Sequence, residues 1–232
     1  SVQKDSKLLH RLLQDTSTRQ KHIDNILQIV EQYQVKGIEI DYEKVAKEDL
    51  PKYILFLEEL YQQLSKKNIT LHVVLEPRFP FDMKLPDGPK YTVMAYNVHG
   101  YHSGPGAKAT FSFLDDLLKK IQKSNQDLAI AFATGGFKWA AQGKAVALTE
   151  IEAEQLLAKT KVKKQRDQAS GAAYFTYSDD NNVRYEVWYA DQETLEKWIS
   201  YVQQKSYHEV VLWRAGGLSS DTLKWIDKQS IK

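Results

Sequence analysis

Short apolar segments alternate with amphipathic helical stretches along most of this chain, and this alternation constrains its fold more than any other feature. Apolar residues recur at helical spacing between five predicted buried strands, near residues 35–42, 69–75, 91–96, 128–133 and 209–214. Such alternation is typical of a parallel sheet covered by helices. The pattern predicts an α/β protein whose functional side chains follow the carboxyl ends of the strands.

Residues from about 135 to 187 interrupt this alternation. The basic stretch KVKKQRDQASG (161–171) is expected to be a solvated helix end and loop. The segments 173–177 and 183–189 flank the turn residues SDDNN, which indicates a β-hairpin. We therefore expect residues 1–232 to form a single domain that carries a small α+β insertion at about 140–187.

Composition excludes several classes of function. The formal net charge of +2 provides no basic surface for nucleic acid. The absence of cysteine removes disulfides, thiolate catalysis and cysteine-ligated zinc. No apolar run approaches the length of a membrane span, so no membrane insertion is expected. His99 and His102 lie three residues apart in a glycine-rich loop, where a hydrogen bond or a substrate contact is favoured over a metal site. We predict no metal and no other cofactor.

The sequence GIEIDYE (37–43) carries the clearest chemical pattern. With a period of two, Glu39, Asp41 and Glu43 share one face of a strand, and apolar residues and Tyr42 occupy the other. On a half-exposed strand this pattern is ordinary. Inside a closed sheet, three carboxylates at this spacing raise the pKa of at least one of them, and a carboxylic acid that keeps its proton is a general acid.

The ends of the other predicted strands carry aromatic and amide side chains. Carboxylates surrounded by flat aromatic walls suit a sugar, because an acid can protonate the glycosidic oxygen while an aromatic ring covers the apolar face of the sugar. No glycine pattern for phosphate binding is present. Glu76 fits either a cleft residue or a loop acid, and we give it no role. The remaining strand-end residues are Tyr96, Asn97, His99, Thr134, Gly135, Trp188, Tyr189, Trp213 and Arg214.

Several motifs in order resemble glycoside hydrolase family 18, the chitinase-like enzymes. GIEIDYE resembles the DGxDxDxE strand of that family, MAYN (94–97) resembles its MxYD motif, and VVLWRAGG (210–217) resembles its last strand with a buried tryptophan. Residues 94–118 and 174–198 are similar to the bacterial subgroup that is often attached to LysM modules and linked to peptidoglycan of the spore cortex and cell wall. The agreement of several ordered motifs is more specific than any single one.

The resemblance implies a (β/α)8 TIM barrel, of which this chain covers strands 4–8, and a substrate-assisted retaining mechanism. Glu43 would protonate the leaving oxygen while the 2-acetamido carbonyl of the substrate attacks the anomeric carbon. Asp41 would orient the acetamide, Glu39 would help to share the proton, and Tyr96 would hydrogen-bond the acetamide oxygen. Trp213 would form the floor under the sugar. Further substrate contacts are expected from Asn97, His99, Trp139 and Tyr189.

The expected function is hydrolysis of β-1,4-linked glycans that contain N-acetylglucosamine, with peptidoglycan ahead of chitin. The resemblance further implies a secreted bacterial protein that acts at the cell envelope or on the spore. The alternative is a non-catalytic or weakly active carbohydrate-binding module on the same fold. The retained Glu43 favours the enzyme.

Departures from the family pattern favour the alternative. Lys36 replaces the leading Asp of the acidic motif, Glu39 is longer than the usual Asp, and Asn97 replaces the Asp of MxYD. Residues 133–137 stand where the family commonly has Pro-x-Tyr-Gly. The first three barrel strands also have no counterpart, so upstream residues, a second chain or a true partial barrel must account for them. We expect a fragment of a larger protein.

Overall fold

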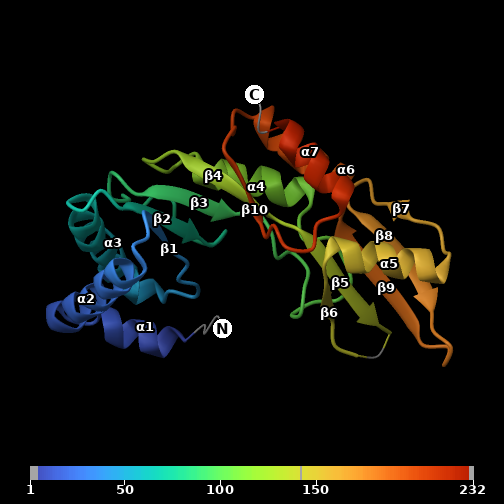
Figure 1. The fold of residues 1–232 in the computed structure, drawn as a ribbon, viewed down its shortest axis with the longest axis horizontal. Helices are drawn as coiled ribbons and strands as arrows, with labels where there is room; N and C mark the ends of the chain where they lie inside the picture. The colour runs from blue at the N-terminus through green and yellow to red at the C-terminus, as the bar shows by residue number, and fades with distance from the viewer. Residues whose placement is uncertain (1–4, 142, 230–232) are drawn as a thin grey trace. The chain divides into compact units, whose positions relative to one another are not determined.

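The computed structural model describes residues 5–141 and 143–229. Backbone contacts divide the chain into two units. Unit 1 contains the residues up to Met94 together with 120–129, and unit 2 contains residues 95–119 and those from Ile130 onward. Each unit has its own strands and helices (Figure 1).

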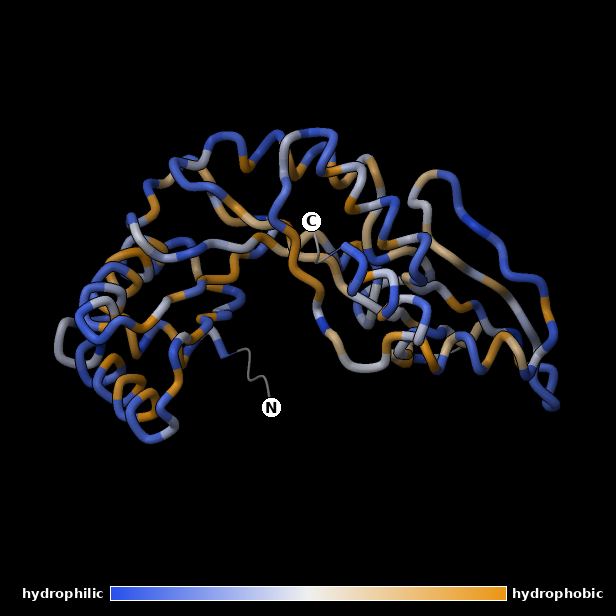
Figure 2. The backbone as a smooth tube through the Cα atoms, turned by 45° about the horizontal axis from the view of Figure 1, so that its top comes forward, coloured by the Kyte–Doolittle hydropathy of each residue, from blue (hydrophilic) through white to orange (hydrophobic). Residues whose placement is uncertain are grey.

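Unit 1 is built on three parallel strands. These are β1 (Gly37–Ile40), β2 (Thr70–Leu75) and β3 (Lys90–Met94), hydrogen-bonded in that order. Three helices pack against one another beside them: α1 (Ser6–Leu13), α2 (Thr16–Tyr33) and α3 (Leu50–Ser65), the last preceded by the short 3-10 helix η1 (Lys47–Asp49). Apolar and polar stretches alternate along these helices in Figure 2, as the periodicity of the sequence predicts.

The helix starts of unit 1 follow from local side-chain chemistry. The carboxylate of Asp15 accepts a hydrogen bond from the Thr18 amide at 2.9 Å and so caps α2. The hydroxyl-bearing residues Thr16–Thr18 lie inside the first turn of that helix. Pro51 occupies the first turn of α3, where its missing N–H costs no hydrogen bond. The apolar face of α3 is buried through Phe56, Leu57, Leu60 and Leu64.

Unit 2 combines a parallel pair with an antiparallel sheet. Strand β10 (Val210–Trp213) runs parallel to β4 (Leu128–Ala133). The antiparallel sheet has the order β6-β5-β9-β8-β7. Its strands are β5 (Gly135–Ala140), β6 (Val146–Leu148), β7 (Gln165–Arg166), β8 (Ala173–Ser178) and β9 (Arg184–Ala190). The helices of this unit are α5 (Glu150–Thr160), α6 (Gln192–Gln203), α7 (Ser220–Gln229) and most of α4 (Phe111–Ile121).

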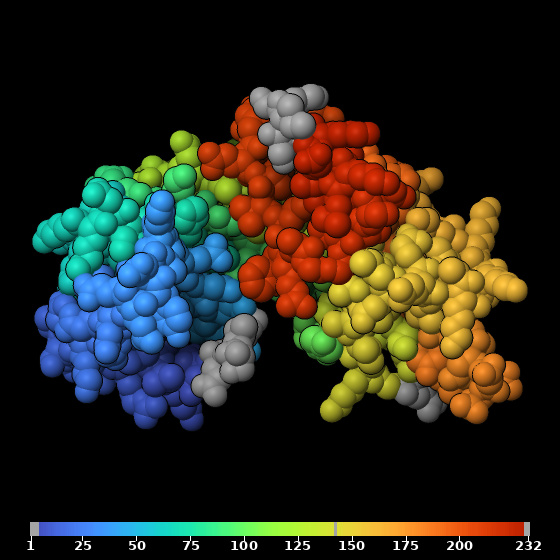
Figure 3. All heavy atoms as spheres, in the orientation of Figure 1, coloured from blue at the N-terminus to red at the C-terminus, as the bar shows by residue number. Residues whose placement is uncertain are grey.

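The inserted sheet takes up a longer part of the chain than the sequence indicates. It begins at Gly135 and ends at Ala190, where 140–187 was expected, and it contains the predicted hairpin as β8 and β9. The left-handed conformation of Gly135 (φ +61°) turns the chain straight from β4 into β5, so no loop marks the boundary. Helix α5 covers this sheet, packing on β5 and β9, and is drawn across the strands in Figure 1; its atoms are the yellow spheres of Figure 3.

The basic stretch 161–171 is not a solvated loop throughout. Arg166 lies in β7 and donates hydrogen bonds to both carboxylate oxygens of Asp191, at 2.8 and 3.1 Å. Asp191 also caps α6 by accepting from the Thr194 amide at 3.0 Å. Asp191 is only 6% exposed, so its ion pair with Arg166 is a buried contact that connects β7 to α6. Charge runs alone do not distinguish such a link from a solvated surface.

The Asp191 link predicts a dependence of stability on pH. Burial by itself raises the pKa of Asp191, but hydrogen bonds from Arg166 and Thr194 outweigh it and lower the pKa from 3.8 to about 2. A lowered carboxyl pKa stabilises the fold above the unfolded-state pKa, and that stability is lost as the pH falls through the folded-state value. Between pH 7 and pH 2, we expect the free energy of unfolding to fall by about 2 kcal/mol more in the parent chain than in Asp191→Asn. Urea unfolding at both pH values measures the difference, and equal losses would contradict this account.

No helix among the described residues is both long enough and apolar enough to cross a bilayer.

Candidate functional site

The acidic segment after β1 begins the site in unit 1. Strand β1 ends at Ile40, whose partner in β2 is Val73, so only Glu39 of the three acids lies in a strand. Glu39 is exposed, whereas Asp41 and Glu43 are half-buried in the irregular segment that follows. The expected stack of three carboxylates on one strand is therefore wrong. Asp41 and Glu43 do follow the carboxyl end of a parallel strand, as predicted.

Tyr42 fixes this segment to the helices of unit 1. Its hydroxyl shares a 2.6 Å hydrogen bond with Nε2 of His22 in α2, and its ring stacks on Phe56 in α3 at 5.9 Å. Burial raises the pKa of Tyr42 to about 12 and lowers the pKa of His22. These shifts favour a neutral phenol and a neutral imidazole in this hydrogen bond. Tyr42 thus packs on the helical side, as the period of two predicts.

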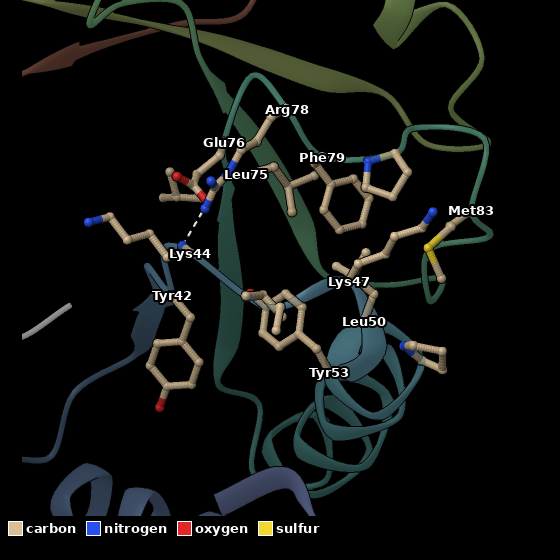
Figure 4. A pocket seen from close by; sticks show the side chains of 15 residues that line it. Tyr42, Lys44, Lys47, Leu50, Tyr53, Leu75, Glu76, Arg78, Phe79 and Met83 are labelled. Atoms are coloured by element: carbon tan, nitrogen blue, oxygen red, sulfur yellow. Dashed lines mark hydrogen bonds and ion pairs between the residues drawn. The ribbon is translucent and has the colours of Figure 1, made fainter. Parts of the chain in front are cut away.

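Glu76 connects the end of β2 to the same segment. Its Oε2 accepts a 2.7 Å hydrogen bond from the backbone N–H of Lys44, drawn as a dashed line in Figure 4. The same oxygen accepts from Nε and Nη2 of Arg78, at 3.1 and 2.9 Å. Sequence reasoning gave Glu76 no role, because an acid before a proline is a common loop residue. Its partners are visible only in three dimensions.

A cavity of about 810 Å³ lies beside this connection, between residues 42–53 and residues 74–83. Figure 4 shows the rings of Tyr53 and Phe79 and the side chains of Leu75, Leu50 and Met83 around it. Burial raises the pKa of Tyr53, with smaller contributions from Tyr42 and the charge of Asp41. Most of the cavity wall is apolar, and the cavity lies next to the acidic segment.

Unit 2 contains a second group of predicted site residues. Tyr96 and Asn97 follow Ala95, whose amide hydrogen-bonds to the carbonyl of Ala131 in β4 at 2.8 Å. Tyr96 is 9% exposed, and Asn97 is exposed with a left-handed backbone (φ +73°), a conformation that asparagine tolerates. Trp213 ends β10 opposite Ala133 and is 50% exposed, so its ring is accessible.

Thr134 holds the chain that follows Trp213. Its Oγ1 donates to the carbonyl of Arg214 at 2.8 Å and accepts from the Arg214 amide at 3.1 Å. Nζ of Lys108 donates to the Thr134 carbonyl at 2.6 Å and lies 5.3 Å from the centre of the Phe137 ring. Burial lowers the pKa of Lys108 to about 8. No sequence motif marks Lys108, a single lysine in a loop.

Two predicted substrate contacts occupy packing positions instead. Tyr189 is 2% exposed in the core of the inserted sheet, where its hydroxyl donates to Glu154 at 2.8 Å. Trp139 is 4% exposed, and its indole N–H donates to the carbonyl of Ser103 at 3.1 Å. Both rings face protein on all sides, so neither offers a flat surface to a sugar. Tyr189 lies near the end of β9, which belongs to the inserted sheet and not to the parallel sheet whose strand ends carry functional side chains.

His99 is fixed by its own loop. Its Nδ1 hydrogen-bonds to the carbonyl of Ala107 at 2.9 Å, and a Cβ at Gly106 would overlap the imidazole ring. Glycine at position 106 therefore permits the close approach. Within residues 5–141 and 143–229, no three His, Cys, Asp or Glu side chains gather as metal ligands.

Comparison with known proteins shows which family the chain matches. The model of glycosyl hydrolases family 18 matches residues 3–217. The chain is 26% identical over 242 residues to the uncharacterized glycosylase YvbX of Bacillus subtilis, covering 97% of this chain and 70% of that protein. It is 26% identical over 227 residues to the cortical fragment-lytic enzyme of Bacillus anthracis, covering 88% of this chain and 52% of that enzyme.

The fold is likewise similar to a solved structure, the spore cortex-lytic enzyme SleL of Bacillus cereus. The TM-score is 0.87 at 22% identity, with 97% of this chain and 56% of the other covered. The chain thus spans about half the length of the two cortex-lytic proteins. Its parallel strands and helices form part of a TIM-barrel-like fold. The match over residues 3–217 shows that this chain belongs to the glycosyl hydrolases of family 18.

Proposed function

We propose that this chain hydrolyses β-1,4-linked glycans containing N-acetylglucosamine by substrate-assisted retaining catalysis. The observation that carries the proposal is the position of Asp41 and Glu43 directly after a parallel strand, in the acidic motif of a glycosidase family. Catalytic groups follow the carboxyl ends of strands in folds of this kind. The acidic pair is also half-buried, which is what a proton donor beside a bound sugar requires.

The proposed roles divide the chemistry between the acids and the substrate. Glu43 protonates the leaving oxygen as the 2-acetamido carbonyl attacks the anomeric carbon, and the carboxylate then deprotonates the water that opens the intermediate. Asp41 orients the acetamide and stabilises the positive charge that develops on its nitrogen. Glu39 supports Asp41. Tyr96 hydrogen-bonds the acetamide oxygen, and the exposed ring of Trp213 supports the apolar face of the sugar.

Asn97 and His99 remain proposed substrate contacts. Asn97 is exposed and offers an amide for sugar hydroxyls, while the Nδ1 bond of His99 to Ala107 fixes the ring and leaves Nε2 for a ligand. We propose a single catalytic domain for the chain. No nucleic acid takes part in this function.

Peptidoglycan is the proposed substrate ahead of chitin. Two of the similar proteins are described as a cortical fragment-lytic enzyme and a spore cortex-lytic enzyme, which supports a glycan of the spore or cell wall. We propose accordingly that the protein is a secreted bacterial enzyme that acts at the cell envelope or on the spore. The alternative function is a carbohydrate-binding module with little or no turnover, favoured by Asn97 and by residues 133–137, where the family pattern is broken.

Incubation with two purified glycans separates these functions. The proposal expects release of reducing ends from cortex-type peptidoglycan at least tenfold faster than from chitooligosaccharides of equal length, with mass spectrometry identifying the cleaved bond. Faster cleavage of chitooligosaccharides would reverse the order of substrates. Binding of either glycan by calorimetry without any cleavage would support the binding module instead.

A further inference from the structure

Glu76 is a charged residue near the proposed proton donor that the mechanism above does not use. It directly follows β2 and is 20% exposed at its side chain, with Oε2 accepting hydrogen bonds from Lys44 and Arg78. All three residues belong to unit 1. In Figure 4 the Glu76 carboxylate lies between the Lys44 backbone and the Arg78 guanidinium, at the edge of the cavity.

The N–H that donates to Glu76 is the Lys44 amide, which lies next to Glu43 in the backbone. The Lys44 amide belongs to the peptide that joins Glu43 to Lys44, so Glu76 fixes the plane of that peptide. Residues 41–46 form neither helix nor strand, and the main-chain ladders of β1 and β2 therefore do not hold them. A hydrogen bond to a carboxylate is shorter and stronger than one between neutral groups, consistent with the 2.7 Å distance.

The backbone of Lys44 also needs support. Its φ of +58° lies in the left-handed region, which is uncommon for residues other than glycine and asparagine. A residue in such a conformation persists when the surrounding structure holds it there. The charged acceptor on the Lys44 amide provides this restraint, and Arg78 holds the acceptor in turn.

We propose that Glu76 is a positioning residue for Glu43: by fixing the Glu43–Lys44 peptide to the end of β2, it sets the direction in which the Glu43 carboxyl points. The inference rests on the proposed function of Glu43. Arg78 acts one step further out, because it orients the Glu76 carboxylate and balances its charge. A misdirected acid slows proton transfer, whereas substrate affinity depends on other contacts.

Three variants test this role by kinetics. Glu76→Ala removes the acceptor and is expected to lower kcat about 30-fold with KM changed less than threefold. Glu76→Gln keeps an oxygen acceptor for the Lys44 amide and is expected to retain kcat within about threefold of the parent. Arg78→Ala is expected to fall between the two. A matched control is Glu152→Ala, which removes a 2.7 Å bond from the Thr149 amide to a carboxylate in α5 and should leave kcat unchanged.

Amide hydrogen exchange of Lys44, measured by NMR, tests the geometry independently of turnover. Exchange is expected to accelerate at least tenfold in Glu76→Ala and to stay near the parent rate in Glu76→Gln. Unchanged exchange in Glu76→Ala, or equal kcat losses in both Glu76 variants, would overturn the positioning role. A parent that cleaves no glycan would refute the proposed function of Glu43 and the catalytic part of this inference, and the exchange rates would then decide whether Glu76 holds the peptide.

Discussion

Glu43→Gln is expected to lower kcat for glycan cleavage by about 10³-fold while leaving KM within threefold of the parent. Glutamine keeps the size of the side chain and its capacity to hydrogen-bond, but it has no acidic proton for the leaving oxygen. Because proton transfer occurs in the transition state, the loss should appear in kcat and not in binding. Release of reducing ends under saturating substrate measures the effect.

The matched control for Glu43 is Glu48→Gln. Glu48 carries the same side chain, lies five residues further along in η1 and is exposed. Its substitution should leave kcat within twofold of the parent. Equal rates for Glu43→Gln and the parent would remove Glu43 from the mechanism, even if the chain cleaves glycans by another route.

Asp41→Asn is expected to give the second largest loss, about 10²-fold in kcat. The substitution preserves the shape of the side chain and removes the negative charge that the proposed mechanism places opposite the acetamide nitrogen. That charge matters most in the transition state, when positive charge develops on the substrate. Steady-state assays on the same glycan measure the loss.

Glu39→Gln provides the comparison for Asp41. Glu39 is exposed in β1 and is proposed only to support Asp41, so solvent screens its charge and the loss should stay below tenfold. A larger loss in Glu39→Gln than in Asp41→Asn would reverse the two assigned roles.

The parallel part of the fold could be predicted from sequence because its signals are local. The predicted strand 128–133 coincides with β4, and the apolar repeat through Leu57, Leu60 and Leu64 marks the buried face of α3. The inserted sheet was predicted less well. Strand β5 escaped detection because Gly135 and Gly136 resemble loop residues, although Gly136 packs against the backbone of Trp188 too closely for any side chain.

The candidate site was predictable where a motif marks it and not where tertiary contacts create it. The acidic pattern marks Asp41 and Glu43 as candidates, whereas Trp213 is 50% exposed, although the motif that it resembles has a buried tryptophan. Tyr189 has the right residue type at a strand end, but the strand belongs to the inserted sheet and its core takes the ring. No motif marks Glu76, because its hydrogen bond joins it to the Lys44 amide, 32 residues earlier in the chain.

The anomeric configuration of the first product tests the proposed mechanism most directly. In a substrate-assisted retaining reaction the acetamide forms one face of the intermediate, so water attacks from the other face and restores the original configuration. Proton NMR during the first minutes of cleavage of a β-linked glycan should show the β-anomer of the new reducing end, followed by slow appearance of the α-anomer. Initial formation of the α-anomer would contradict the mechanism and the roles given to Asp41 and Glu43.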